Sequence, residues 1–245
     1  DAPSRIVVAS PPMRVVAAIQ SRMRSTRLPG KALRLIEGKP VVVRIWERLA
    51  LCGTLDTAVV ATSEDPSNDV LAKVCEREGI GCARWGTDEQ VAERLLYVIE
   101  GQGADYLVRI TGDCPLVDPG LVDGVVSSAR QGHPDLCDYA SNVFPVRTYP
   151  DGLDVEVLSR ACLVRLAKEP VENLTTTIWN RPREFATTGI MHTADLSKLG
   201  WTLDTSLDLD FIQWVYRRLP DGFSWLDVLG LARCTATEYR WRFPV

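Results

Sequence analysis

Apolar runs alternate with periodic apolar segments along the chain as far as Arg130. Short runs rich in β-branched residues are typical of buried strands, and apolar residues that recur every three or four positions are typical of helices. The expected strands are Val15–Ile19, Thr57–Thr62, Ile80–Arg84 and Asp105–Ile110. The expected helices are Pro40–Leu51, a segment capped by Asp65 or Ser67 that runs to Glu78, Asp88–Glu100 capped by Thr87, and a segment from Asp118 and Pro119 to Arg130. This alternation predicts an α/β fold in which helices cover both faces of a mostly parallel sheet.

The pattern changes after about residue 137, where the connections become longer and less regular. The expected elements there are the strands Tyr139–Asn142, Leu153–Leu158 and Glu184–Met191 and the helix Leu207–Leu219. A chain of 245 residues suits one domain, which we place at residues 13–245, with an arm or subdomain at about 138–200. Residues 1–12 are expected to be a disordered extension before a natural start at Met13. No role is predicted for residues 220–245.

The composition excludes several classes of protein. A net charge of -4 disfavours nucleic acid as a partner. No apolar run reaches the ~20 residues that a membrane span needs, and residues 1–12 lack the basic start of a signal peptide. The seven cysteines contain no CxxC pair, which is typical of reduced thiols in a reducing compartment. We therefore expect a cytoplasmic protein.

The segment QSRMRSTRLPGK, residues 20–31, carries four basic residues directly after the first expected strand. They are Arg22, Arg24, Arg27 and Lys31. Guanidinium and ammonium groups bind phosphate oxygens, and ligands of parallel sheets bind at the carboxyl ends of strands. The loop therefore indicates a site for a small anion, although its spacing is not that of a Walker A loop. A solvated basic turn remains the alternative interpretation.

Two carboxylates follow apolar stretches in the same way. Asp113 follows the strand DYLVRI, and Asp204 follows the apolar start of WTLDT, with Asp208 and Asp210 shortly after. If Asp113 and Asp204 meet beside the basic loop, they form a site for Mg²⁺, which takes few protein oxygens and shares the rest with phosphates and water. The alternative is that Asp113 forms a turn and that Asp204 or Thr205 caps the next helix.

The segment YPDGLDVEV, residues 149–157, places Asp154 and Glu156 on one face of an expected strand. Two acids on one face are costly to bury without partners. They either lie on a solvent-facing edge strand or bind substrate hydroxyls, a cation or the arginines.

Four motifs in this order resemble a known family. IQSRMRSTRLPGK, RITGDCPLVDP, YPDGLDVEV and WTLDTSLDL are similar to segments of the cytidylyltransferases of the spore-coat polysaccharide type, relatives of the acylneuraminate and 3-deoxy-manno-octulosonate cytidylyltransferases. The resemblance covers roughly residues 13–215. It implies a three-layer α/β/α nucleotidyltransferase fold of the glycosyltransferase-A type, and a homodimer formed through the projecting arm at about 138–200. It also implies transfer of CMP from CTP to a small anionic acceptor, with Mg²⁺ as cofactor and pyrophosphate as leaving group.

The resemblance also assigns roles to residues. Arg22, Lys31 and Asp113 are the implied catalytic residues, and Asp113 and Asp204 the implied metal ligands. The implied nucleotide-binding residues are Ala18, Ile19, Gln20, Arg22, Ser25, Arg27, Lys31, Arg84, Thr111, Gly112 and Asp113. The implied acceptor-binding residues are Asn142, Tyr149, Asp151, Asp154 and Glu156.

Three departures from the family pattern matter: the first adds bulk and charge near the phosphates, and the other two belong to the acceptor side. Arg24 replaces a small glycine, Gln90 stands where an aspartate is common, and VENLTTTIW replaces a His-containing segment similar to REHVTPYI. We therefore expect an unusual acceptor, such as a phosphonate or phosphate metabolite of a secondary pathway in place of a sugar acid. No histidine lies in the four motifs, which suits an acceptor that is already ionised.

Two further classes of function stay open at the level of sequence. A sugar-1-phosphate nucleotidyltransferase or a glycosyltransferase of the same fold usually shows another glycine-rich opening or a DxD motif, and the DLD at Asp208–Asp210 lies in an expected helix. A non-catalytic nucleotide-binding protein is the alternative outside enzymes. The sequence decides neither the acceptor nor CTP over UTP.

Overall fold

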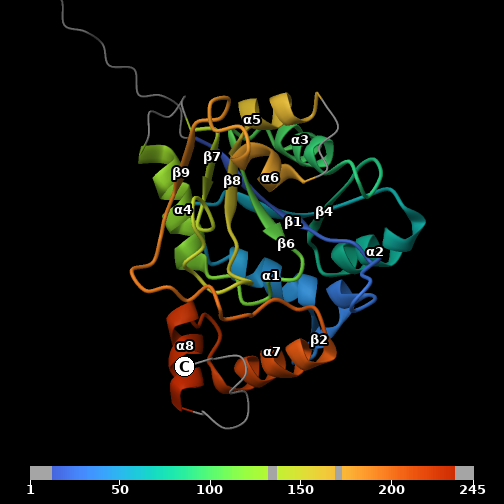
Figure 1. The fold of residues 1–245 in the computed structure, drawn as a ribbon. Helices are drawn as coiled ribbons and strands as arrows, with labels where there is room; N and C mark the ends of the chain where they lie inside the picture. The colour runs from blue at the N-terminus through green and yellow to red at the C-terminus, as the bar shows by residue number, and fades with distance from the viewer. Residues whose placement is uncertain (1–12, 132–136, 169–172, 235–245) are drawn as a thin grey trace, which may run out of the picture.

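The computed structural model describes residues 13–131, 137–168 and 173–234, and the expected extension at residues 1–12 lies outside them. Its centre is a seven-stranded sheet with the strand order β5-β4-β1-β6-β8-β7-β9 (Figure 1). These strands are β1 (Val15–Gln20), β4 (Thr57–Thr62), β5 (Gly81–Arg84), β6 (Tyr106–Thr111), β7 (Tyr139–Ser141), β8 (Glu156–Ser159) and β9 (Thr187–Gly189). All pairs are parallel except those that β8 makes with β6 and β7. The expected mostly parallel sheet is confirmed.

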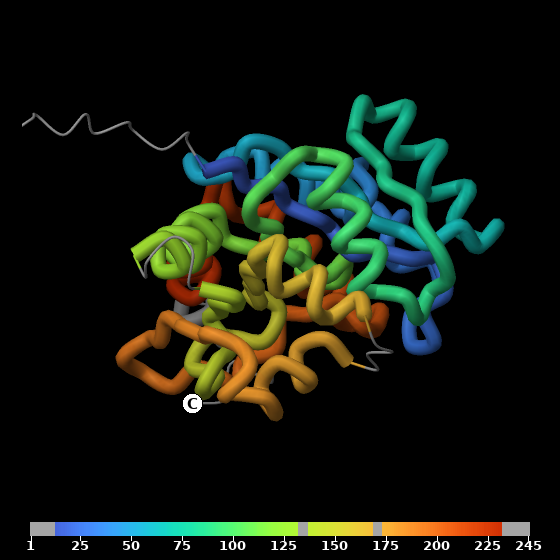
Figure 2. The backbone as a smooth tube through the Cα atoms, turned by 90° about the horizontal axis from the view of Figure 1, so that it is seen from above, coloured from blue at the N-terminus to red at the C-terminus, as the bar shows by residue number. Residues whose placement is uncertain are grey.

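Helices cover both faces of the sheet, so the fold has three layers. One face is covered by α1 (Val41–Leu49), α2 (Asp69–Arg77) and α4 (Pro119–Gln131). The helices α7 (Ser206–Arg218) and α8 (Trp225–Cys234) contribute to the same core from below α1 in the view of Figure 1. The other face is covered by α3 (Val91–Gly101), α5 (Arg160–Leu166) and α6 (Leu174–Trp179), and α3 packs beside α5 (Figure 2). A short hairpin, β2 (Leu35–Ile36) and β3 (Lys39–Pro40), lies outside the main sheet.

Alternation along β1 explains why two separate cores form. Val15, Ala17 and Ile19 point into the core under α1, and Val16 and Ala18 point into the core under α3. All five side chains are fully buried, because β1 has a neighbouring strand on each side and helices above and below. Continuous apolar sequence is typical of such a strand. The expected α/β/α nucleotidyltransferase architecture is therefore confirmed.

Some predicted boundaries are wrong for identifiable reasons. The helix expected from Asp88 begins only at Val91, because residues 86–90 form a loop in which Gln90 Oε1 accepts from the Thr87 N–H (3.0 Å). The strand expected from Leu153 begins at Glu156, because the side chain of Asn142 takes the backbone bonds of residues 153 and 155. Asp65 is a cap, as expected, but of the 3₁₀ helix Pro66–Asn68 that precedes α2: its carboxylate accepts from the Ser67 N–H (2.8 Å).

The strands of the segment 138–200 belong to the main sheet. β7, β8 and β9 all lie in the seven-stranded sheet, and α5 and α6 pack on its second face. The strands after residue 137 therefore continue the sheet, and the arm or subdomain at about 138–200 stays a prediction. Among the described helices, none combines the length and apolarity that crossing a membrane requires.

Candidate active site

A cavity of about 1140 Å³ opens at the carboxyl ends of β1, β4 and β6. Gln20 ends β1, Ser63 follows β4 and Thr111 ends β6, and all three line the cavity. Parallel α/β sheets bind ligands at this edge. The structure therefore brings most of the predicted residues together: Gln20, Arg22, Ser25, Arg27, Lys31, Thr111, Gly112, Asp113 and Asp204 line the cavity.

The backbone of the basic loop is anchored. Met23 N–H donates to the side-chain oxygen of Asn68 (2.8 Å), and the Gly30 N–H donates to the Met23 carbonyl (3.1 Å). Gly30 has a φ of 68°, in the left-handed region that glycine adopts without strain. This turn directs the chain into the 3₁₀ helix Lys31–Leu33, which places Lys31 in the cavity.

Each arginine of the loop is paired with a carboxylate from elsewhere in the chain. The pairs are Arg22–Asp88 at 3.3 Å, Arg24–Asp65 at 3.2 Å and Arg27–Asp204 at 2.9 Å. The three arginine side chains are 56%, 68% and 66% exposed. Pairs this exposed contribute about 0–1 kcal/mol each, so a multiply charged anion can draw the guanidinium groups away from these partners.

Lys31 lies between the two predicted metal-binding carboxylates. Its Nζ donates to Asp113 Oδ2 at 2.8 Å, to Asp204 Oδ1 at 3.1 Å and to the carbonyl of Leu203 at 3.1 Å. Burial disfavours the charged form of Asp113, but the charge and hydrogen bond of Lys31, together with hydrogen bonds from Thr111 and the backbone, outweigh burial and lower the pKa of Asp113 below its usual value. The expectation that Asp113 and Asp204 meet is therefore confirmed, with a lysine between them.

The N-cap of helix α7 is Thr205, so the Asp204 carboxylate is available to the cluster with Lys31 and Asp113. The Thr205 hydroxyl accepts from the Asp208 N–H (3.3 Å), and the Asp208 carboxylate accepts from the Thr205 N–H (2.6 Å), which completes a capping box. The Leu203 N–H donates to the Asp113 carbonyl (2.8 Å), so the two acidic segments are also joined through the backbone. Of the two alternatives for a helix cap, Thr205 is the cap, and the expected helical position of Asp208–Asp210 is confirmed.

The opposite side of the cavity is built around Asp88. Its carboxylate accepts from Ser63 Oγ (2.5 Å) and pairs with Arg22. The buried Arg94 side chain donates to the carbonyl of Thr87 (2.7 Å) and also lines the cavity. These contacts hold the loop 86–90 next to the basic loop.

Comparisons with known proteins show the family of this chain. A family model described as cytidylyltransferase matches residues 16–168. The chain is 30% identical over 218 residues to the spore coat polysaccharide biosynthesis protein SpsF of Bacillus subtilis, which covers 83% of this chain and 87% of that protein. The chain belongs to the cytidylyltransferase family.

Two further matches place the cytidylyltransferase among its relatives. A 3-deoxy-manno-octulosonate cytidylyltransferase of Trichlorobacter lovleyi is 34% identical over 125 residues, 51% of this chain and 48% of that protein. The chain therefore spans about half the length of this second relative. A solved cytidylyltransferase structure from Leptospira borgpetersenii superposes with a TM-score of 0.83 at 26% identity, covering 91% of this chain and 94% of that one.

Three of the residues assigned to the nucleotide lie outside the cavity of this cytidylyltransferase. Ala18 and Ile19 are fully buried in the two cores on either side of the central strand β1. Arg84 is paired with Asp69 at 2.8 Å and donates to the carbonyl of Ser63 at 3.5 Å. The residues that line the cavity include none of these three. For Ala18 and Ile19 the resemblance implies contacts through backbone groups, so these assignments and that of Arg84 stay predictions.

The five residues assigned to the acceptor are bonded to other parts of the cytidylyltransferase instead of lining the cavity. Asn142 is buried and bonds the backbone of residues 153 and 155, Asp151 and Asp154 pair with Arg147, and Tyr149 packs against His192 and Trp225. Glu156 is buried in β8, which lies between β6 and β7, so the alternative of a solvent-facing edge strand is wrong. Of the alternatives given for Asp154 and Glu156, the structure shows pairing with arginines.

Residues that the sequence did not single out also line the cavity. Asp88 and Arg94 come from the loop before α3 and from α3 itself, and Lys168 follows α5. Arg94 lies on the buried side of the helix α3. A charged residue at an otherwise apolar helix position was the sequence signal that could have identified it as a site residue. Lys168 had no such signal, because its position depends on how α5 packs over the sheet.

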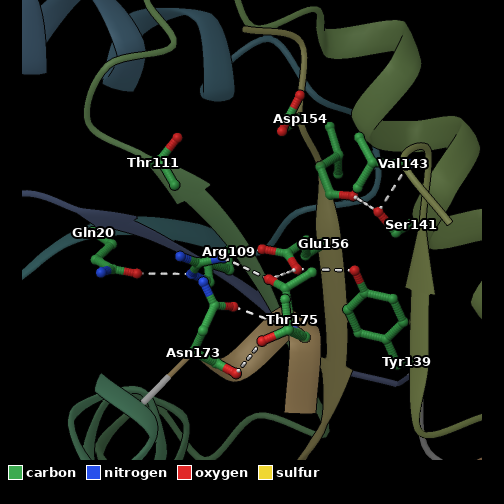
Figure 3. A network of polar contacts seen from close by, with 12 residues as sticks. Gln20, Arg109, Thr111, Tyr139, Ser141, Val143, Asp154, Glu156, Asn173 and Thr175 are labelled. Carbon is green, nitrogen blue, oxygen red and sulfur yellow. Dashed lines mark hydrogen bonds and ion pairs between the residues drawn. The ribbon is translucent and has the colours of Figure 1, made fainter. Parts of the chain in front are cut away.

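A buried polar network reaches the cavity from the sheet (Figure 3). Arg109 of β6 forms an ion pair with Glu156, its direct neighbour on β8, and donates from Nε to Gln20 Oε1 at 2.7 Å. Glu156 Oε1 also accepts from the hydroxyls of Tyr139 (2.9 Å) and Thr175 (2.6 Å). Gln20 is the member of this network that lines the cavity.

Proposed function

We propose that this cytidylyltransferase transfers CMP from CTP to a small anionic acceptor and releases pyrophosphate. The observation that carries the proposal is the cluster of Lys31, Asp113 and Asp204 beside a loop of three arginines in one cavity. A polyanionic triphosphate is held by such cations, and phosphoryl transfer depends on positioning and charge neutralisation more than on covalent help from the protein. Membership of the family supports CTP as the donor.

The arginines and Lys31 bind and orient the triphosphate in this proposal. An oxyanion of the acceptor forms a bond to the α-phosphorus, the bond from that phosphorus to the bridging oxygen breaks, and pyrophosphate leaves with the electron pair. Lys31 and the loop arginines stabilise the negative charge that develops on the leaving group. An acceptor that is already ionised needs no general base from the protein.

The two carboxylates suit a Mg²⁺ ion that arrives with the nucleotide. Mg²⁺ binds through one or two carboxylates together with substrate phosphates and water. Among the residues that the structure describes, no group of three or more acidic, histidine or cysteine side chains converges on a metal position, so a site made of protein ligands alone is not supported. We assign Asp113 and Asp204 as the ligands; the ion, when bound, neutralises phosphate charge.

The acceptor is expected to carry a carboxylate, phosphate or phosphonate. Lys168 supplies a cation to the cavity from the side of α5, away in sequence from the basic loop. The segment at Asn173 that replaces the family's histidine begins α6, where Asn173 caps the helix by accepting from the Thr176 N–H (3.1 Å). This change supports a phosphonate or phosphate metabolite over a sugar acid. We also propose that the enzyme is a homodimer, which sedimentation analysis tests directly.

Pyrophosphate release tests the proposal. Each of the four nucleoside triphosphates is incubated with Mg²⁺ and a panel of sugar acids, phosphates and small phosphonates. We expect release with CTP and one acceptor class, and none when Mg²⁺ is removed. Binding of CTP without release from any pair would favour a nucleotide-binding protein without this activity, and brisk turnover of a sugar acid with none of phosphonates would refute the unusual acceptor.

A further inference from the structure

A row of polar side chains crosses the sheet on the face covered by α3, α5 and α6. The row consists of Gln20, Arg109 and Glu156, which come from the adjacent strands β1, β6 and β8. Each lies two positions along its strand from an apolar residue of the core on that face, so its side chain lies on the same face. Arg109 and Glu156 are paired partners in the strand register. The row therefore has a fixed geometry that the sheet itself imposes, and Gln20 is its end at the cavity.

The chemistry of arginine fixes how the Gln20 amide is turned. A guanidinium group donates hydrogen bonds and accepts none, so the atom that faces Arg109 Nε at 2.7 Å is the amide oxygen of Gln20. Figure 3 shows this oxygen facing Arg109 and the amide nitrogen on the far side of the group. To residues that the structure describes, Nε2 of Gln20 makes no hydrogen bond.

Arg109 is in turn held against rotation. Its ion pair with Glu156 is buried, and the second oxygen of Glu156 is occupied by the hydroxyls of Tyr139 and Thr175. A buried carboxylate with all its partners in place keeps its orientation, because any rotation leaves charged groups unpaired. The Nε–H of Arg109 therefore stays directed at Gln20 Oε1.

The backbone carbonyl of Gln20 is also occupied, and its side chain carries the amide N–H groups available to a ligand. The Gln20 carbonyl accepts from the Gly112 N–H (2.8 Å), and the following residue, Ser21, donates to the Ala61 carbonyl (3.1 Å). Gln20 lies at the start of the basic loop and lines the same cavity as Lys31.

We propose that Arg109 is a positioning residue that fixes Gln20 as a hydrogen-bond donor to an oxygen of the bound nucleotide. The inference rests on the proposed binding of CTP in this cavity. Gln20 Nε2 donates to a carbonyl or phosphate oxygen of CTP, and Arg109 prevents the amide from flipping to present its own oxygen. An oxygen presented there would repel the ligand, so the orientation of one amide contributes to nucleotide affinity.

Calorimetric titration with CTP and Mg²⁺ tests this with a set of matched variants. Gln20→Met keeps the length of the side chain and removes the donor. Arg109→Lys keeps a positive charge for Glu156 but has no nitrogen at the Nε position, so Gln20 loses its partner while the buried acid stays paired. Gln213→Met makes the same chemical change at a glutamine of α7 whose amide bonds the Leu35 carbonyl, and it serves as the control.

We expect Gln20→Met to weaken CTP binding by about ten- to a hundredfold, the value of a hydrogen bond to a charged or strongly polar oxygen. Arg109→Lys is expected to weaken it by a similar factor, and the double variant no further than Gln20→Met alone, because both changes remove one interaction. Gln213→Met should bind CTP as the unchanged protein does. Circular dichroism and thermal unfolding establish that each variant is folded.

The outcomes separate this inference from the proposed function. If the unchanged protein binds no CTP, the proposed function fails first. If it binds CTP and Gln20→Met binds equally well, Gln20 donates nothing to the nucleotide and the inference is overturned. If both single variants bind weakly but their losses multiply in the double variant, Arg109 acts separately from Gln20 and is not its positioning residue.

Discussion

Replacing Lys31 by methionine should destabilise the protein at neutral pH, because it leaves Asp113 and Asp204 facing each other without their shared cation. Removing one partner of a buried ion pair costs about 3–5 kcal/mol. The side chains here are 16%, 24% and 18% exposed, so water screens part of the repulsion. We therefore expect a loss of about 2–3 kcal/mol in the free energy of unfolding near pH 7.

The pH dependence of this loss identifies its cause. In the unchanged protein Lys31 lowers the pKa of Asp113 despite burial, so the stability this carboxylate contributes is present above its ordinary pKa of about 4 and is lost as pH falls through the lower folded value. In Lys31→Met, burial and the charge of Asp204 act without the lysine and raise the pKa of Asp113. The variant then binds a proton more readily than the unfolded chain, and its deficit shrinks as pH falls.

Urea unfolding at about pH 7.5 and about pH 5 measures both effects. The double variant Lys31→Met with Asp113→Asn should recover much of the loss at the higher pH, because the amide carries no charge. Lys39→Met is the matched control, since Lys39 is half exposed and pairs with Glu47 at the surface. A Lys31→Met variant as stable as the unchanged protein at pH 7.5, or a deficit equal at the two pH values, would refute the reasoning.

Three further changes test the cluster and its surroundings. Asp204→Asn should raise the Mg²⁺ concentration for half-maximal pyrophosphate release by about tenfold or more, since one of two assigned charged ligands is lost; an unchanged Mg²⁺ dependence would remove Asp204 from the metal site. Thr205→Ala should cost about 1 kcal/mol of stability through the lost cap of α7 while CTP affinity measured by calorimetry stays the same. Gly112→Ala would place a carbon 2.7 Å from Ser21 Oγ and 3.0 Å from the Gln20 carbonyl oxygen. Denaturant unfolding should therefore show a loss of about 1–3 kcal/mol in the free energy of unfolding. Gly101→Ala is the control, because a carbon added there meets no atom within 4 Å.

Elements with one periodicity and clear end signals were predictable from the sequence. The apolar run of β1 and the alternation of strands and helices up to α4 follow from local patterns that tertiary packing does not alter. The loops at the ends of β1 and β6 followed from the same patterns, because parallel strands bring their carboxyl ends to one edge. The meeting of Asp113 with Asp204 was stated only as a condition, since it depends on where the chain returns after β9.

The surroundings of the residues assigned to the acceptor could not be predicted, because an alternating pattern of acids does not show which arginine each acid pairs with. Asp154 and Glu156 alternate along the chain as substrate-binding acids would, but Arg147 and Arg109 pair with them in the fold. The place of the strands after residue 137 could not be predicted for a related reason. Short strands after residue 137 show no local sign that they continue the sheet, and β8 does so in the antiparallel direction between β6 and β7.

The pairing of every loop arginine with a carboxylate makes nucleotide affinity a balance between two sets of ion pairs. In the proposed complex the three arginines exchange these carboxylates for ligand oxygens, so added salt weakens the contacts of the empty protein together with those of the complex. The affinity should therefore fall less steeply with ionic strength than the number of arginines suggests. The cytidylyltransferase thus carries its own counterions, which keeps binding of a highly charged substrate steady across changing salt.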